Sequence, residues 1–164
     1  PPGANPIHVV ADTYPSGGAL GGYTLRANWG TPPVACVPYT SWYGGVMAGT
    51  RTMSGGTGSA TMGPDSTSGN TNSNSYGSGP DELWTINVTA NDTATFSLCS
   101  GATWDTKMAL YDCTGALIMS NDDYCSVQSY FSGISMTTAN SPYYLLIDGY
   151  YSSSYGTYTA TMSW

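Results

Sequence analysis

The sequence predicts an all-β fold, a β-sandwich or jelly roll with long loops rich in Gly, Ser and Thr. Apolar and polar residues alternate along several short runs, and turn-forming residues separate these runs at intervals of about ten residues. No stretch carries the apolar stripe of an amphipathic helix, and the low content of Leu, Glu, Lys and Arg also disfavours helices. Four cysteines, an even number, add two expected disulfides.

Residues 1–53 are irregular and rich in Pro, Gly and aromatic side chains. We expect two short strands there, Pro6–Val10 and Tyr23–Ala27, as part of the same β domain as the rest of the chain. A strand near a terminus either completes its own sheet or pairs with the sheet edge of a neighbouring molecule, because edge backbone groups accept any suitable partner. The candidate assembly strand therefore comprises Ile7, His8, Val9 and Val10.

Residues 54–80 contain few apolar side chains and many Gly, Ser, Thr and Asn. This composition is typical of a flexible linker or a long surface loop, so we expect the segment to bury little.

Residues 81–164 carry the clearest alternation and form the expected sandwich core. Over Leu83–Thr89 every second residue is apolar, and Thr93–Cys99 repeats the pattern after an Asn-Asp turn. The further expected strands are Lys107–Tyr111, Ala116–Met119, Tyr130–Met136, Tyr143–Asp148 and Thr157–Trp164.

Composition excludes several classes of protein. The chain has 3 Lys+Arg against 10 Asp+Glu and a net charge of -7, so a nucleic-acid backbone would repel it. No apolar run approaches the ~18 residues of a membrane span. The sequence starts Pro-Pro-Gly without Met. We therefore expect an extracellular or cell-surface protein from which a leader was removed.

The cysteines Cys36, Cys99, Cys113 and Cys125 favour disulfides over a zinc site. Zinc sites need closely spaced ligand pairs, and eleven residues separate even the nearest cysteines, Cys113 and Cys125. The chain has one histidine, His8. Disulfides are typical of secreted proteins, in agreement with the composition.

The C-terminal half, residues 79–164, resembles the bacterial pre-peptidase C-terminal domain family, a group of secreted β-sandwich modules attached to proteases and other extracellular proteins. Several blocks in the family's order carry this resemblance. They are Gly79–Trp84, Ser97–Cys99, Trp104–Asp112, Asn121–Cys125, Tyr143–Tyr150 and Tyr155–Tyr158.

The chain also resembles a cysteine-bearing branch of this family, but it has Ser120 where that branch has a Cys. The resemblance then implies that Cys113 pairs with Cys125 and that Cys36 pairs with Cys99.

Calcium is the candidate cofactor, because hard cations bind carboxylate and amide oxygens clustered in loops. Asn121, Asp122 and Asp123 form the densest such cluster, and the resemblance places Asp105 and Asp148 in comparable turns. The alternative is an ordinary turn with Asp side chains bonded to the local backbone, and the absence of the D-x-D-x-D-G spacing favours it.

Exposed aromatic residues are the second candidate binding feature, because aromatic rings stack on sugars and anchor protein interfaces. We expect exposure in the polar segment around Tyr150, Tyr151 and Tyr155, and we add Trp42 and Tyr43 as candidates. For Tyr143, Tyr158 and Trp164 we expect burial, in place of the missing aliphatic residues.

The sequence offers no convincing catalytic arrangement. His8 has no Ser-centred turn to accompany it, and Glu82, the lone glutamate, lacks a clear partner for a glycosidase pair.

We therefore expect a non-catalytic secreted module that self-associates into a surface layer or filament. The alternative is an accessory module that holds a secreted hydrolase on polysaccharide or protein.

Overall fold

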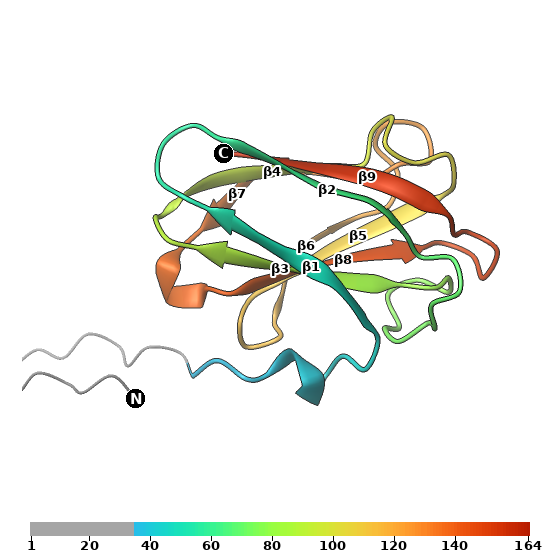
Figure 1. Cartoon of the computed structure of the whole chain (residues 1–164), viewed down its shortest axis with the longest axis horizontal. Coiled ribbons are helices and arrows are strands. Elements are labelled where there is room, and N and C mark those ends of the chain that lie inside the picture. Colours follow the sequence, from blue (N-terminus) through green and yellow to red (C-terminus); the bar gives the residue numbers. More distant parts are fainter. Residues whose placement is uncertain (1–34) are drawn as a thin grey trace, which may run out of the picture. The chain divides into compact units, whose positions relative to one another are not determined.

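The computed structural model describes residues 35–164, so the expected strands Pro6–Val10 and Tyr23–Ala27 lie outside it. The described part is a β-sandwich, which confirms the predicted fold class (Figure 1). One sheet, sheet A, has the order β1-β3-β8-β5-β6, and the other, sheet B, has the order β2-β9-β4-β7. The elements are η1 Tyr39–Ser41, β1 Val46–Met53, β2 Ser59–Ser66, β3 Glu82–Val88, β4 Asp92–Ser97, β5 Thr106–Tyr111, β6 Leu117–Asn121, β7 Tyr130–Met136, η2 Thr138–Asn140, β8 Tyr143–Gly149 and β9 Thr157–Ser163.

The main core lies between the two sheets and is built from the alternating residues that the sequence identified. Trp84, Ile86 and Val88 of β3 face it, as do Tyr158 and the two apolar residues that follow it at alternate positions in β9. Buried aromatic rings and Met side chains thus supply apolar area that aliphatic residues provide in most cores.

A second, smaller core covers the outer face of sheet A. Every residue of β8 is buried, because the segment that contains η1 packs on the face that would otherwise be exposed. The ring centroid of Trp42 lies 4.9 Å from that of Tyr111 and 5.6 Å from that of Tyr144. The adjacent residues Tyr143 and Tyr144 are therefore both buried, one in each core.

The two disulfides join Cys36 to Cys113 and Cys99 to Cys125, so the pairing implied by the family resemblance is wrong. Cys99 lies just after β4, with Leu98 between them, and Cys125 lies shortly before β7; these two strands pair in sheet B. The Cys36–Cys113 bond instead attaches the η1 segment to the turn after β5, where the Val37 amide also donates to the Cys113 carbonyl at 2.9 Å. Strand pairing, not proximity in the sequence, selects the partners.

Residues 54–80 are more ordered than their composition indicates. They include β2, which pairs with β9 and places Met62 in the main core. The expectation that this segment buries little is wrong for that strand. Strand β1, in the segment 1–53, also lacked a clear alternating pattern, and it pairs in parallel with β3.

Three buried carboxylates hold the second half of this segment in place. Asp81 accepts hydrogen bonds from the Ser73 and Asn74 amides, at 2.8 and 2.7 Å, and from the Tyr43 hydroxyl at 2.8 Å. Asp148, which is fully buried, accepts from the Gly77 amide at 2.6 Å. Backbone amides of the segment are therefore the hydrogen-bond donors for buried acids of the sandwich.

Glu82, the third of these carboxylates, lies in the main core. It accepts hydrogen bonds from the Tyr158 hydroxyl and from the side-chain amide of Asn70, the latter at 3.1 Å. The Trp84 indole in turn donates to the Tyr158 hydroxyl at 2.6 Å. These hydrogen bonds connect Asn70 to β3 of sheet A and to β9 of sheet B.

Burial raises the pKa of all three carboxyl groups, because it disfavours the charged form. The pKa of Asp148 rises to about 7, through burial first and then the nearby charge of Asp81. The amides of Gly77 and Gly149 and the charge of Lys107 oppose this rise. The folded protein consequently binds a proton at Asp148 more tightly than the unfolded chain does.

Peptide mapping of the unreduced protein is expected to recover Cys36 with Cys113 and Cys99 with Cys125. The double substitution C99S/C125S opens a link across 26 residues, and the chain-entropy model then predicts a loss of about 3.5 kcal/mol in unfolding free energy. Chemical denaturation measures this loss. Recovery of a peptide that links Cys113 to Cys125 would contradict this disulfide pairing and the strand arrangement that brings Cys99 beside Cys125.

Acidification is expected to stabilise the fold. The contribution of Asp148 is fully present below its unfolded pKa of about 4 and is lost as the pH rises through its folded pKa of about 7. Thermal melts between pH 5 and pH 8 should show a decrease of about 2 kcal/mol in unfolding free energy. D148N should reduce this dependence, whereas the matched change D92N, at the first residue of β4, should leave it in place. Equal pH dependence in D148N and the parent would refute the assignment.

Candidate functional site

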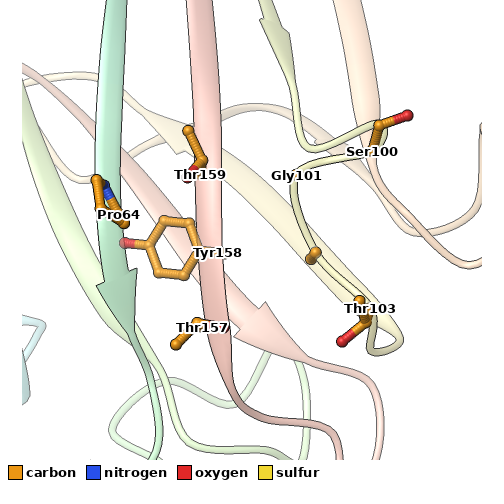
Figure 2. Close-up of a pocket in the computed structure, with 8 residues that line it drawn as sticks. Pro64, Ser100, Gly101, Thr103, Thr157, Tyr158 and Thr159 are labelled. Carbon is orange, nitrogen blue, oxygen red and sulfur yellow. The ribbon is translucent and has the colours of Figure 1, made fainter.

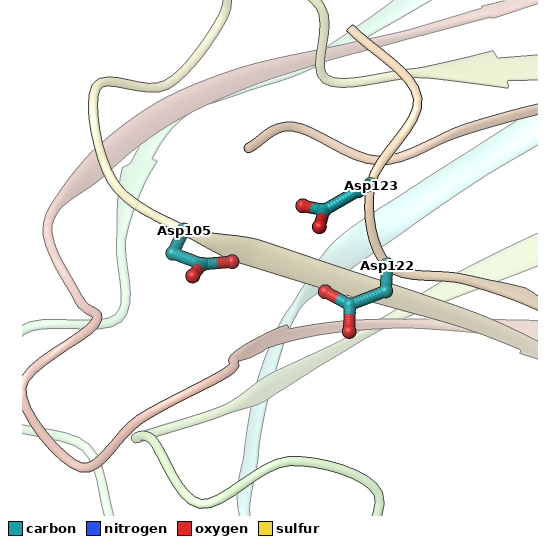
Figure 3. A group of neighbouring side chains, drawn as sticks. All are labelled: Asp105, Asp122 and Asp123. Atoms are coloured by element: carbon teal, nitrogen blue, oxygen red, sulfur yellow. The ribbon is translucent and has the colours of Figure 1, made fainter. Parts of the chain in front are cut away.

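Three aspartates meet at one end of sheet A, and we call Asp105, Asp122 and Asp123 the acidic cluster. Asp105 directly precedes β5, and the other two directly follow β6. Because β5 and β6 are antiparallel neighbours, the start of one lies beside the end of the other. One carboxylate oxygen from each residue lies within 4.8 Å of the others, and Figure 3 shows the three groups around a common space.

Few hydrogen-bond donors or positive charges among the described residues offset the negative charge of the acidic cluster. Asp105 Oδ1 and Asp122 Oδ1 are buried and have no hydrogen-bond partner among the described residues. The Lys107 ammonium lies 4.0 Å from Asp122 Oδ2. Burial first, and then the charge of Asp123, raises the pKa of Asp105, and burial is also the main cause of the raised pKa of Asp122. A bound cation would offset both effects.

The side-chain oxygens of the two remaining predicted ligands accept hydrogen bonds from backbone amides. Asn121 Oδ1 accepts a hydrogen bond from the Tyr130 amide at 2.9 Å, which joins the end of β6 to the start of β7. Asp148 is buried under residues 67–81 and accepts from two backbone amides. The structure thus brings together three of the five predicted metal ligands.

Exposed tyrosines flank the acidic cluster. Tyr150, Tyr151 and Tyr155 are 39%, 59% and 47% exposed, as the sequence predicted. The Tyr150 amide donates to the Asp105 carbonyl, which places this aromatic loop directly beside the cluster. Tyr124 is also exposed, at 67%, and the sequence analysis did not single it out. Its position directly after Asp123 was the available signal.

The prediction that Tyr43 is a binding residue is wrong. It is 2% exposed, and its hydroxyl is bound to Asp81. Trp42 is partly buried in the second core, against Tyr111 and Tyr144. Both residues fill the space between the η1 segment and sheet A, so their role in the structure is packing.

Strand β6 forms an apolar edge of sheet A. Among the described residues it pairs with β5 alone. Leu117, Ile118 and Met119 are 52%, 39% and 39% exposed, and the strand contains no charged residue. The pairing with β5 skips Ile118, and such an irregularity redirects side chains locally. We call the outward side of Leu117–Asn121 the β6 edge.

The other edge strands are less apolar where they are exposed. On β1, Arg51 reaches over to the Thr61 carbonyl of β2 with a 2.6 Å hydrogen bond, which links these two edges. On β7, the exposed positions are Ser132, Gly133 and Ser135. The β6 edge therefore differs from the edges of the other three outer strands.

A shallow hollow of about 200 Å³ lies between the turn at Gly101 and strands β2 and β9 (Figure 2). Its lining consists mainly of Thr and Ser hydroxyls and small side chains. The one titratable group in it, Tyr158, is bound through its hydroxyl to Glu82, and burial together with that acid raises its pKa. The hollow offers no free ionisable group. The described helices have three residues each, and neither is long and apolar enough to cross a membrane.

Comparison with solved structures shows a structural likeness to a known β-sandwich domain. No protein-family model matches the chain, and no curated protein does. Among solved structures, the chain is similar to the pre-peptidase C-terminal domain of a collagenase from Bacillus anthracis, with a TM-score of 0.37 and 12% identity. The match covers 69% of this chain and 91% of that chain. That domain belongs to the family that the sequence blocks resemble, and membership of this chain in the family stays a prediction.

Proposed function

We propose that the protein is a non-catalytic subunit of an extracellular assembly and that its copies associate through a sheet edge. The observation that carries this proposal is the β6 edge. An unpaired strand presents a row of backbone donors and acceptors, and soluble monomers commonly guard such a strand with charged side chains or proline. On the β6 edge, three consecutive large apolar side chains occupy the positions where such guards are found.

Covering the exposed apolar side chains of this edge would be energetically favourable. Burying Leu117, Ile118 and Met119 against another strand would gain roughly 25 cal/mol for each Å² of apolar surface removed from water. Pairing would also satisfy the outward backbone groups of β6. The two disulfides support an extracellular location, because such bonds persist in oxidising compartments.

A second function is supported at the acidic cluster, which we propose as a calcium site. Two buried carboxylate oxygens without partners and a third acid within reach form a partial set of oxygen ligands. Backbone carbonyls and water complete such sites in many proteins. The exposed rings of Tyr124, Tyr150 and Tyr151 favour an accessory role, in which this end of the sandwich holds polysaccharide or protein.

Removal of residues 1–12 is expected to convert an assembling protein into a monomer, because it deletes the predicted strand Pro6–Val10. Size exclusion with light scattering over a range of concentrations, and negative-stain microscopy, compare the truncated and full chains. A full chain that stays monomeric at every concentration would contradict the assembly and leave the accessory role as the better proposal.

Calcium is expected to raise the unfolding free energy by about 2.7 kcal/mol at a hundred times its dissociation constant, if it binds the folded state alone. Thermal melts with calcium and with chelator measure this shift. D123N should abolish it and should also stabilise the calcium-free protein slightly, because it removes one of three neighbouring negative charges. The matched change D92N should retain the full shift. Identical melts of the parent with calcium and with chelator would refute the site.

A further inference from the structure

We propose that Pro6–Val10 of one copy pairs with the β6 edge of a second copy, so that copies join head to tail. This inference rests on the proposed function and specifies its joint. It assigns the two halves of the contact to different parts of the chain: a donor strand near the N-terminus and an acceptor edge on sheet A.

The described chain begins beside the acceptor edge. Cys36 is bonded to Cys113, and the Val37 amide donates to the Cys113 carbonyl. Only three residues separate Cys113 from Leu117, the first residue of β6. Asp112 closes this turn by accepting hydrogen bonds from the Thr114 and Ala116 amides, at 2.8 and 3.1 Å. The residues that precede Cys36 therefore connect to the sandwich at the start of β6.

The length of the connection favours a second copy as the acceptor. A strand that leaves the sandwich beside β6 and pairs with that same strand needs a link of about 2–5 residues. Between Val10 and Cys36 the chain has residues 11–35, which are 25 residues. Fully extended, this link spans up to about 80–90 Å, several times the ~30 Å diameter of a small domain. The link is thus far longer than pairing with its own β6 requires and long enough to reach a neighbouring copy.

The chemistry of the two strands is complementary. Ile7, Val9 and Val10 are apolar and β-branched, which favours an extended strand. Pro6 stands at the first position, where a missing amide hydrogen is tolerated. The β6 edge has no charged side chain and exposes large apolar side chains. Main-chain hydrogen bonds would then supply affinity, and the side chains would supply register.

Such a contact uses two different surfaces, so it is heterologous. Each copy gives one strand and accepts one strand, and repetition of the contact produces an open chain unless the rotation between copies closes a ring. Pairing of two β6 edges with each other would instead stop at a dimer.

The test combines two variants that each retain half of the joint. The variant that lacks residues 1–12 keeps the acceptor edge, and L117K/M119K keeps the donor strand but places charges on the edge. Each variant alone should be a monomer, and an equimolar mixture should form a heterodimer by light scattering. The matched control V46K places a charge at an exposed position of β1, on the opposite edge of sheet A, and should assemble like the parent.

A second measurement is independent of the lysine variants and of their folding. A synthetic peptide of residues 1–12, added to the truncated protein, should slow hydrogen exchange of the amides in residues 117–121 by at least about tenfold. Peptide binding without such slowing would overturn the assignment of β6 as the acceptor.

The outcomes separate this inference from the proposed function. If L117K/M119K assembles like the parent while the truncated chain does not, the protein assembles through another edge and the inference fails alone. If the truncated chain dimerises by itself, two β6 edges pair and the head-to-tail contact is refuted. If the full chain is monomeric and its β6 amides lose protection on truncation, the strand pairs within its own chain, and both proposals fail.

Discussion

The buried carboxylates Asp81, Glu82 and Asp148 are the constraint on which the described structure depends. A carboxylate removed from water costs several kcal/mol unless hydrogen-bond donors replace its hydration. Here the segment 67–81 supplies many of the donors, from the Ser73, Asn74 and Gly77 amides. Displacement of that segment would leave each acid with fewer donors, namely Tyr43 for Asp81, Tyr158 for Glu82 and the Gly149 amide for Asp148. A polar sequence with few apolar side chains is therefore held as firmly as a strand.

The sequence predicted the strands that have their own alternating pattern and missed those that depend on distant partners. Tyr158 and Met162 alternate with Thr and Ser, so β9 was recognisable, whereas β1 and β2 consist largely of Gly, Thr, Ser and Met without clear alternation. The disulfide pairing has the same origin, because Cys99 meets Cys125 through the pairing of β4 with β7. Long-range sheet order cannot be read from local spacing.

The candidate site divides in the same way. Asp122 and Asp123 were predictable as a cluster in the sequence and Asp105 through the family resemblance, and the three meet because they stand at the ends of adjacent antiparallel strands. Asp148 was not, because its side chain lies under a segment whose position depends on that same side chain. Tyr43 was predicted to be a binding residue because aromatic residues crowd this part of the sequence, and its burial follows from the attachment of the η1 segment to sheet A. For β6, the strand was predictable but its place at the edge was not.

Both ends of β6 are fixed, which bears on how an edge can act as a binding surface. The strand lies between Cys113 and Cys125, and each of these cysteines is bonded to a different part of the chain. At its end, Asn121 accepts from the Tyr130 amide, and the Asp122 carbonyl accepts from Ser129 Oγ. A rigid edge loses little conformational entropy when a partner strand docks, so more of the contact energy remains as affinity. Calcium at the acidic cluster would add a further link between the end of β6 and the start of β5, and would thereby couple ion binding to the rigidity of the same edge.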